Sequence, residues 1–329
     1  MEIGKLPNDV LKSLVFSNIK ESRKEVLIRP SIGEDCAAVD FGEELCVISS
    51  DPITGTDNEI GTIAVHVSCN DIAASGSEPI GLMVTMLVPP GETEANLESV
   101  IKQLSVTAAS LNVDILGGHT EVTDAVNRFV ISITAIGKTT GKNVVKTSGA
   151  KPGDDLILTK YAGLEGTSIL AHEHQFKLAE MLGSQIVARA QKLIEQISVI
   201  KEGMIAAKHG AHAMHDVTEG GVLGAIWEMC EASGCGAEVF KEQIPVLDET
   251  REICRYFNID PLRLISSGSM LIAAKDGAAL VDKLQSNGIM ASVIGKITAG
   301  EKPLLHDENK IVIISPPYSD ELYKVKKSC

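Results

Sequence analysis

Acidic side chains recur at three places in the first half of the sequence. Asp35 precedes a predicted strand, Asp51 ends another, and Asp71 lies within a helical pattern. Mg²⁺ prefers hard oxygen ligands of this kind when it bridges protein carboxylates and phosphate oxygens. Taken singly, each acid is also explained as a solvated turn or capping residue. Taken together, they predict a site for magnesium and a phosphorylated ligand.

Asp71 gives the strongest of these signals. It follows Asn70 in the segment VHVSCNDIAASG, whose other residues are mostly small or apolar. An ionised carboxylate in such a helix is costly unless it is paired or coordinated. We therefore expect Asp71 to act as a ligand.

A second acidic motif, HDVTEGG, lies between a predicted strand and a predicted helix and contains Asp216 and Glu219. Its glycines let the backbone approach a ligand, and the N-terminus of the helix favours phosphate. A plain strand-to-helix turn explains the spacing equally well. A third motif, GGHTE at 117–121, follows another predicted strand.

Two other patterns fail as known sites. The segment AIGKTTGK ends like a phosphate-binding loop, but Ser132 stands where that loop requires glycine. His209, His212 and His215 recur every third residue, whereas a helical zinc motif needs a spacing of four. We interpret these histidines as surface residues or as partners of other ligands.

Mixed α/β structure is predicted in both halves of the chain. Thr93 is expected to cap a helix whose apolar residues repeat every three or four positions. The nearly unbroken apolar run 80–88 predicts a strand that is buried on both faces. The polar segment 142–155 marks a boundary between an N-terminal domain, 1–148, and a C-terminal domain, 149–329. The predicted strands are 45–50, 80–88, 113–116, 128–138, 156–159, 212–217, 269–274, 290–296 and 311–314, and the predicted helices lie within 1–30 and at 59–75, 93–108, 165–174, 183–209, 221–232, 249–257 and 276–287.

Composition limits the partners. The formal net charge of −14 opposes binding to nucleic acids or anionic membranes, so we expect neither. No apolar run reaches the ~18 to 20 residues that span a bilayer, and no signal pattern opens the chain. Seven cysteines without CxxC spacing indicate free thiols in a reducing compartment. The sequence therefore predicts a cytoplasmic protein.

The motifs together resemble the AIR synthase-related superfamily. This group includes aminoimidazole ribonucleotide synthetase, thiamine-monophosphate kinase, selenophosphate synthetase and the hydrogenase-maturation carbamoyl-dehydratase (HypE-like) type. Any one motif is weakly specific, but all five occur in order and extend over both predicted domains. They are GEDCAAV (33–39), SSDPI (49–53), NDIAASGSEPIG (70–81), GGHTEV (117–122) and HDVTEGG (215–221).

The resemblance implies a two-domain α/β (α+β) fold and a homodimer in which the N-terminal domains pair through their sheets. It also implies that ATP and Mg²⁺ bind in a cleft beside that interface. Carried over by position, Asp35, Asp51 and Asp71 become the magnesium–phosphate ligands. The other residues that it places at the ATP site are Asn70, Gly117, Gly118, His119 and Thr120, with Asp216 and Glu219 as weaker candidates.

Within this group the sequence is most similar to the hydrogenase-maturation type. The segments GLEGTSIL and NIDPL match its second domain, and Cys329 resembles its C-terminal cysteine. Three positions depart from it: His119 replaces Asp, Glu121 replaces Lys, and Ser267 replaces Glu. The Pro-Arg-Ile-Cys ending is also missing.

These departures lead to a main reading and two alternatives. The main reading is a Mg-dependent enzyme that uses ATP to phosphorylate or activate an unidentified small molecule or carrier, without chemistry at Cys329. The first alternative is a HypE-like maturation factor that dehydrates a carbamoylated Cys329. The second is a non-catalytic nucleotide-binding partner in a maturation complex. Retention of all three ligand acids favours an enzyme.

Overall fold

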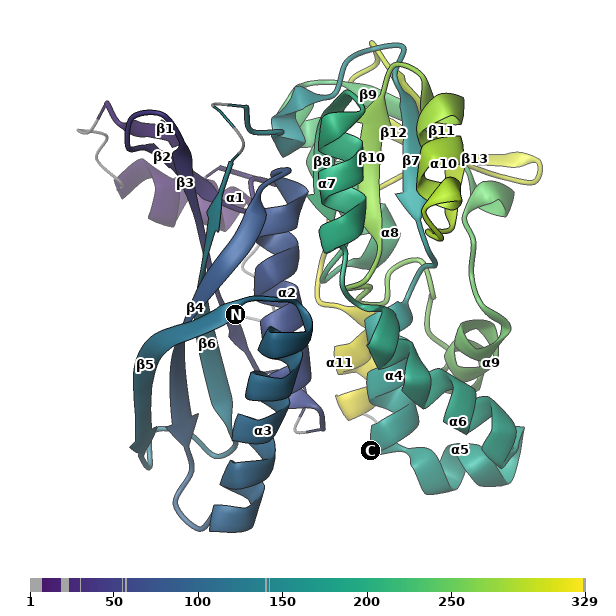
Figure 1. Cartoon of the computed structure of the whole chain (residues 1–329). Coiled ribbons are helices and arrows are strands. Elements are labelled where there is room, and N and C mark those ends of the chain that lie inside the picture. The colour runs from purple at the N-terminus through teal and green to yellow at the C-terminus, as the bar shows by residue number, and fades with distance from the viewer. Residues whose placement is uncertain are drawn as a thin grey trace.

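A computed structural model describes residues 8–18, 24–29, 31–54, 56, 58–139, 141 and 143–327. In this part of the chain the strands form two separate sheets, one of six strands and one of seven (Figure 1). All strands of the first sheet lie before residue 139, and all strands of the second lie after residue 154. The predicted α/β fold is confirmed. The boundary at 148/149 falls between the sheets and stays a prediction.

The first sheet has the strand order β1-β2-β3-β6-β4-β5, and β4–β5 is its parallel pair. Helices α2 and α3 pack together against one face, where Ile72 and Leu104 meet Ile131 and Ile133. Its elements are β1 Val26–Ile28, β2 Ala37–Asp40, β3 Leu45–Ile53, α2 Ile60–Ala74, β4 Glu78–Val88, α3 Glu94–Ser110, β5 Asp114–Val122 and β6 Val130–Lys138, preceded by α1 Asn8–Val10, η1 Leu11–Val15 and η2 Phe16–Asn18.

The second sheet has the order β13-β12-β9-β11-β7-β10-β8 and is covered on both faces. Strand β7 explains this, because Leu156 and Leu158 belong to one core cluster with residues of α8, while Ile157 belongs to another with residues of α7 and α10. Its elements are η3 Thr147–Gly149, β7 Asp155–Thr159, α4 Leu164–Glu173, α5 Gln175–Leu182, α6 Ser184–Gln191, η4 Lys192–Gln196, α7 Ile200–Lys208, β8 Ala211–Asp216, α8 Gly221–Ser233, β9 Gly236–Phe240, η5 Lys241–Gln243, α9 Asp248–Phe257, β10 Met270–Ala274, α10 Gly277–Ser286, β11 Ala291–Thr298, β12 Pro303–Asp307, β13 Lys310–Ile313 and α11 Glu321–Lys327.

Helix α2 joins the two domains, because it lies between the first sheet and the second domain (Figure 1). The buried side chain of Asn70 donates to the Ile197 carbonyl oxygen at 2.7 Å and accepts from the Val199 N–H at 2.8 Å. Gly203 of α7 lies so close to α2 that a Cβ at position 203 would be 2.1 Å from the Ala73 carbonyl oxygen. Asn70, expected at the ATP site, instead fixes the domains to each other.

Several predicted elements are confirmed, and others need correction. The helix at 59–75 and the cap at Thr93, which accepts from the Asn96 N–H, are both present. The prediction of one helix over 183–209 is wrong, because this segment forms α6, η4 and α7 in succession. Strands β9 and β12 were not predicted. Strand β4 is not buried on both faces, because Ile80 and Met83 are more than 40% exposed. In the described part of the chain, no helix is long and apolar enough to cross a membrane.

Candidate functional site

A cavity of about 1060 Å³ lies between the two domains, and residues of both line it. This volume is in the range of pockets that hold ligands of nucleotide size. Among the described lining residues, Arg128 and His215 are the basic ones, and carboxyl groups outnumber them. The acids are Glu34, Asp35, Asp51, Asp71, Asp124, Glu165, Asp216, Glu219 and Glu228.

The loop that carries Asp35 is held against the second domain. Gly33 adopts a φ of 75°, and a Cβ at this position would approach the Glu228 carbonyl oxygen to 3.2 Å. Glu34 accepts hydrogen bonds from the N–H and hydroxyl groups of Ser148. The carboxylate of Asp35 then meets His215 of β8, with 2.8 Å between Oδ2 and Nδ1. A glycine-dependent turn therefore delivers an acid of the first domain to the second.

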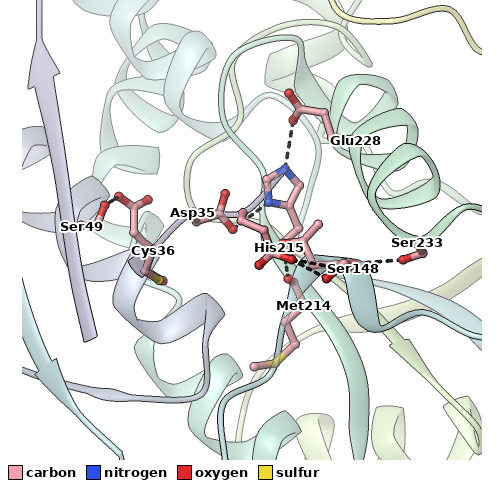
Figure 2. A network of polar contacts seen from close by, with 11 residues as sticks. Asp35, Cys36, Ser49, Ser148, Met214, His215, Glu228 and Ser233 are labelled. Atoms are coloured by element: carbon pink, nitrogen blue, oxygen red, sulfur yellow. Dashed lines mark hydrogen bonds and ion pairs between the residues drawn. The ribbon is translucent and has the colours of Figure 1, made fainter. Parts of the chain in front are cut away.

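His215 is buried between two carboxylates, as Figure 2 shows. Its Nδ1 contacts Asp35, and its Nε2 lies 3.0 Å from Oε2 of Glu228 in α8. Burial alone would lower the pKa of His215, but the carboxylates of Asp35 and Glu228 raise it well above its usual value. The charged imidazolium thus offsets part of the negative charge. The interpretation of His215 as a partner of another ligand agrees with this geometry.

Asp71 lies in the last turn of α2 at the wall of the cavity and is only 4% exposed. Its Oδ2 accepts a hydrogen bond from the Ser49 hydroxyl of β3, and its carbonyl oxygen accepts from the Cys36 thiol. Burial, followed by the charges of Asp216, Asp51 and Asp35, raises the pKa of Asp71 well above its usual value.

Such a cluster is suited to a bound cation. Without one, like charges and burial oppose ionisation of Asp71, and a divalent ion would remove that opposition. Among these acids, Asp35 and Asp216 each have a carboxylate oxygen within 4.8 Å of the other. The residues present therefore fit magnesium held by carboxylates. Asp51 is close enough to Asp71 to raise its pKa. It lies inside β3, which continues to Ile53, so the prediction that it ends a strand is wrong.

Asp216 ends β8, and the turn after it carries Thr218 and Glu219 into the cavity wall. The first N–H groups of α8 have partners within the protein: Gly220 donates to Asp320 at 2.7 Å, and Leu223 donates to the Leu262 carbonyl oxygen. These contacts favour the plain strand-to-helix turn over a phosphate site at this helix terminus.

The far end of the cavity is formed by Glu165 of α4, Ser267, and Tyr323 of α11. Burial raises the pKa of Glu165 to about 7, although the nearby Ser267 opposes the rise. The Tyr323 hydroxyl donates to Glu219 at 2.8 Å. A smaller pocket of about 70 Å³ adjoins this end and shares Glu165, Glu219 and Tyr323 with it.

The motif at 117–121 is not brought to the cavity in the single chain. Gly117, Gly118, His119 and Thr120 lie within β5, an exposed edge strand, and not in a turn after it. Close packing against β4 explains why residue 118 is glycine, because a Cβ there would lie 1.8 Å from the Val84 carbonyl oxygen. These four residues do not meet the acid cluster within one chain.

Glu121 also lies on β5, where it is exposed and pairs with His119 at 3.4 Å. Glu121, which replaces Lys of the hydrogenase-maturation type, therefore does not line the cavity of its own chain.

Sequence reasoning missed four lining residues: Glu165, Glu228, Arg128 and Tyr323. Glu228 follows HDVTEGG by two helical turns on the same helix, so its spacing from Gly221 offered a signal. Glu165 stood inside the segment GLEGTSIL, as an acid among apolar and small residues. The places of Arg128 and Tyr323 depend on the packing of the two domains, and the local sequence gave no signal for them.

The fold and the cavity define a class: a two-domain α/β protein with an acidic, nucleotide-sized site between its domains. Residues 33–139 match the N-terminal domain of AIR synthase related proteins, and residues 151–307 match their C-terminal domain. The chain belongs to the AIR synthase related family. The family resemblance and the two-domain fold predicted from the motifs are confirmed.

Relatives point to one branch of this family. A Methanocaldococcus jannaschii protein named for hydrogenase expression and formation is 29% identical over 311 residues, which cover 92% of this chain and 90% of that protein. Carbamoyl dehydratase HypE of Escherichia coli is 27% identical over 255 residues, 75% of this chain and 73% of the relative. The prediction that the chain is an enzyme agrees with these matches.

A solved structure of the hydrogenase maturation protein HypE in complex with ATP superposes with a TM-score of 0.70. It covers 98% of this chain and 97% of that chain at 19% sequence identity. At this identity the match establishes a shared fold.

Proposed function

We propose that the protein is a HypE-like, ATP-dependent dehydratase of hydrogenase maturation. It would bind Mg-ATP in the cavity and convert a carbamoyl group on the sulfur of Cys329 into a cyano group. This is the alternative to the generic ATP-using enzyme of the main reading. The observation that carries it is the carboxylate cavity between the domains, whose far wall includes a side chain of the last helix.

The acid cluster is suited to the nucleotide. Asp35, Asp51 and Asp71 would hold Mg²⁺, which neutralises the charge between these carboxylates and the phosphates. Asp71 supports this assignment most directly, because its buried carboxyl group has a raised pKa that a bound cation would lower again.

The carrier cysteine is close in sequence to the cavity. Tyr323 of α11 lines the cavity, and Cys329 follows it by six residues. Cys329 lies outside the described residues. Helix α11 continues to Lys327, so four of these six residues are helical, and the segment spans at most about 13 Å while the helix persists, at ~1.5 Å per helical and ~3.3 Å per extended residue. This short connection to a cavity-lining helix supports Cys329 as the carrier thiol.

Two departures from the hydrogenase-maturation type, Glu121 in place of Lys and Ser267 in place of Glu, argued against chemistry at Cys329, and the structure weakens both arguments. Glu121 lies on β5 and does not line the cavity of its own chain. Ser267 does line the cavity in place of a carboxylate, but Glu165 supplies one at the same end. The missing Pro-Arg-Ile-Cys ending is the departure that still stands.

The reaction balances without a further reagent. The carbamoyl oxygen attacks the γ-phosphorus, an O–P bond forms, and the bond to the ADP oxygen breaks. The C–O bond then breaks with its electrons going to phosphate, while nitrogen loses two protons and a C≡N bond forms. The products are the S-cyano group, ADP and hydrogen phosphate, with one proton released.

Cyanate provides the test, because it carbamoylates thiols directly and replaces a maturation partner as donor. The treated protein is incubated with Mg-ATP and the Cys329 peptide is analysed by mass spectrometry. We expect the carbamoyl adduct to lose the mass of one water molecule only with ATP and Mg²⁺, and a Cys329→Ala control to show no such product. ATP turnover with an unchanged adduct would contradict the proposal and restore the generic ATP-using enzyme.

We also propose a homodimer formed through the first sheet. Strand β5 is an edge strand whose nine residues are all exposed, including Ile115, Leu116 and Val122. Exposed apolar residues continue onto β4 at Ile80 and Met83. A long apolar edge strand is an unstable surface for a monomer unless another chain covers it.

A further inference from the structure

A buried carboxyl group at the far end of the cavity has an open hydrogen-bonding position. Glu165 occupies the first turn of α4, after Gly163 in a left-handed conformation, and is 4% exposed. Its Oε2 atom has no hydrogen-bond partner among the described residues. The hydroxyl group of Ser267, which is 1% exposed, lies beside this carboxyl group and opposes the rise of its pKa. Both side chains line the cavity.

The neighbouring acids are already engaged. Glu219 accepts the hydrogen bond of the Tyr323 hydroxyl. Asp320 accepts from the backbone N–H groups of Gly220, Ile265 and Leu322. Of the described acids at this end of the cavity, Glu165 is the one whose carboxyl group is left available to a ligand.

An open carboxyl group of this kind is a poor choice for stability alone. Burying a polar group without a partner costs free energy, and an apolar side chain of the same shape would pack at less cost. Perturbed, buried carboxyls that face a cavity are candidates for acid–base chemistry. The charged and titratable groups around Glu165 are Glu219, Asp320 and Tyr323, and burial is the largest influence on it.

We propose that Glu165 is the catalytic base that accepts a proton from the nitrogen of the carbamoyl group, with Ser267 as a positioning residue beside it. This role rests on the proposed dehydratase function. The first N–H proton passes to a Glu165 oxygen as the O–P bond forms, and the protonated carboxyl then gives it to the departing phosphate oxygen. The second N–H proton follows through the same carboxylate to solvent.

The proposal also accounts for Ser267. The hydrogenase-maturation sequences that this chain resembles have Glu at this position, and here the neighbouring Glu165 supplies a carboxylate at the same end of the cavity. Position 267 has room for a hydroxyl next to Glu165, whereas two buried carboxylates at this place would repel each other.

The charge of the cavity end agrees with this substrate group. A carbamoyl nitrogen is a hydrogen-bond donor, and Glu165 is an acceptor when ionised. A general base works best when its pKa is near the operating pH, and burial brings the pKa of Glu165 to about 7.

The test compares single-turnover dehydration of cyanate-treated protein between the parent, Glu165→Gln, and a matched control, Glu180→Gln. Glu180 is exposed on α5 and lies outside the cavity. We expect Glu165→Gln to slow the reaction at least ~100-fold, the lower range for loss of a general base. Its stabilisation by Mg-ATP should stay within twofold of the parent in apparent affinity, and Glu180→Gln should match the parent throughout.

The pH profile separates a base from a structural residue. The parent rate should rise as pH increases through about 7, and the Glu165→Gln rate should lose that rise. The double variant Glu165→Gln with Ser267→Glu places a carboxylate at the neighbouring position and should recover part of the lost rate.

Each outcome decides one proposal. A parent that binds Mg-ATP but never loses water from its adduct contradicts the dehydratase function, and with it a base for that reaction. A parent that reacts while Glu165→Gln reacts equally fast overturns the role of Glu165 alone. A slow Glu165→Gln variant that retains the rise with pH also overturns it, because the titrating base then lies elsewhere.

Discussion

Replacing Glu165 with Gln should make the protein more stable, by an amount that grows as the pH rises from about 4.5 and is complete above about pH 7. The carboxyl group is buried, and burial raises its pKa from 4.5 to about 7. An acid whose pKa is raised by folding binds a proton more tightly in the folded state. Folding stability then falls as pH rises from the unfolded pKa to the folded one, and the loss is complete above about pH 7.

The magnitude follows from the shift. A change of one pKa unit corresponds to ~1.4 kcal/mol, so the rise from 4.5 to about 7 corresponds to roughly 3 kcal/mol of stability lost at pH 8. Gln has the same shape and no charge, so it avoids this loss. With an unfolding entropy of ~2.1 cal/mol/K per residue, 3 kcal/mol raises the melting temperature of a 329-residue chain by about 4 °C.

The assay is thermal unfolding of the parent and Glu165→Gln at a series of pH values from 4.5 to 8. Comparing the two proteins at each pH cancels the titration of all other groups. The melting temperatures should coincide near pH 4.5 and diverge up to pH 8, while Glu180→Gln should follow the parent. A constant difference at every pH, or a variant that is less stable at pH 8, would refute the reasoning. A gain in stability with a loss of activity is expected of a residue kept for chemistry.

Three further predictions concern the acid cluster, the contact between domains and the dimer. Asp71→Asn should remove the Mg-dependent part of stabilisation by ATP, which is ~2.7 kcal/mol at 100 times the dissociation constant, and leave the free protein folded; an unchanged thermal shift with Mg-ATP would show that Asp71 is structural. Asn70→Ala should destabilise the protein by about 2 kcal/mol or more, because the Ile197 and Val199 backbone groups lose buried partners, and urea unfolding measures this directly. Light scattering should give twice the 34.9 kDa of one chain, and Leu116→Glu on β5 should shift it toward the monomer; a parent mass near 34.9 kDa would remove the dimer.

The parts of the site that are local in sequence could be predicted. Asp35, Asp71 and Asp216 each lie in a short motif whose residue types indicate a ligand, and the structure brings all three to one cavity. The boundaries of α2 and α3 were also legible, because their apolar spacing and the Thr93 cap are local signals.

The parts that depend on packing could not be predicted. Asn70 stands next to Asp71, and only the position of η4 and α7 shows that its amide is used by backbone groups of the second domain. The surroundings of the Glu165 carboxyl group include Ser267 and Asp320, which are distant from it in sequence. The motif at 117–121 was placed at the nucleotide by resemblance, whereas its strand lies on an exposed edge that a single chain does not bring to the cavity.

Helix α2 also determines how the chain can fold while it is being synthesised. Fourteen of its fifteen residues are buried, and its outer face is covered by residues of the second domain such as Leu264, which packs in one cluster with Ile63. At ~5 to 20 residues per second, a ribosome makes Leu264 roughly 10 to 40 seconds after Ile63. The first sheet therefore leaves the ribosome with an apolar helix face still uncovered. Chaperones that hold nascent chains have a natural binding surface there, and a gene truncated after the first domain would yield a sticky product rather than a small working module.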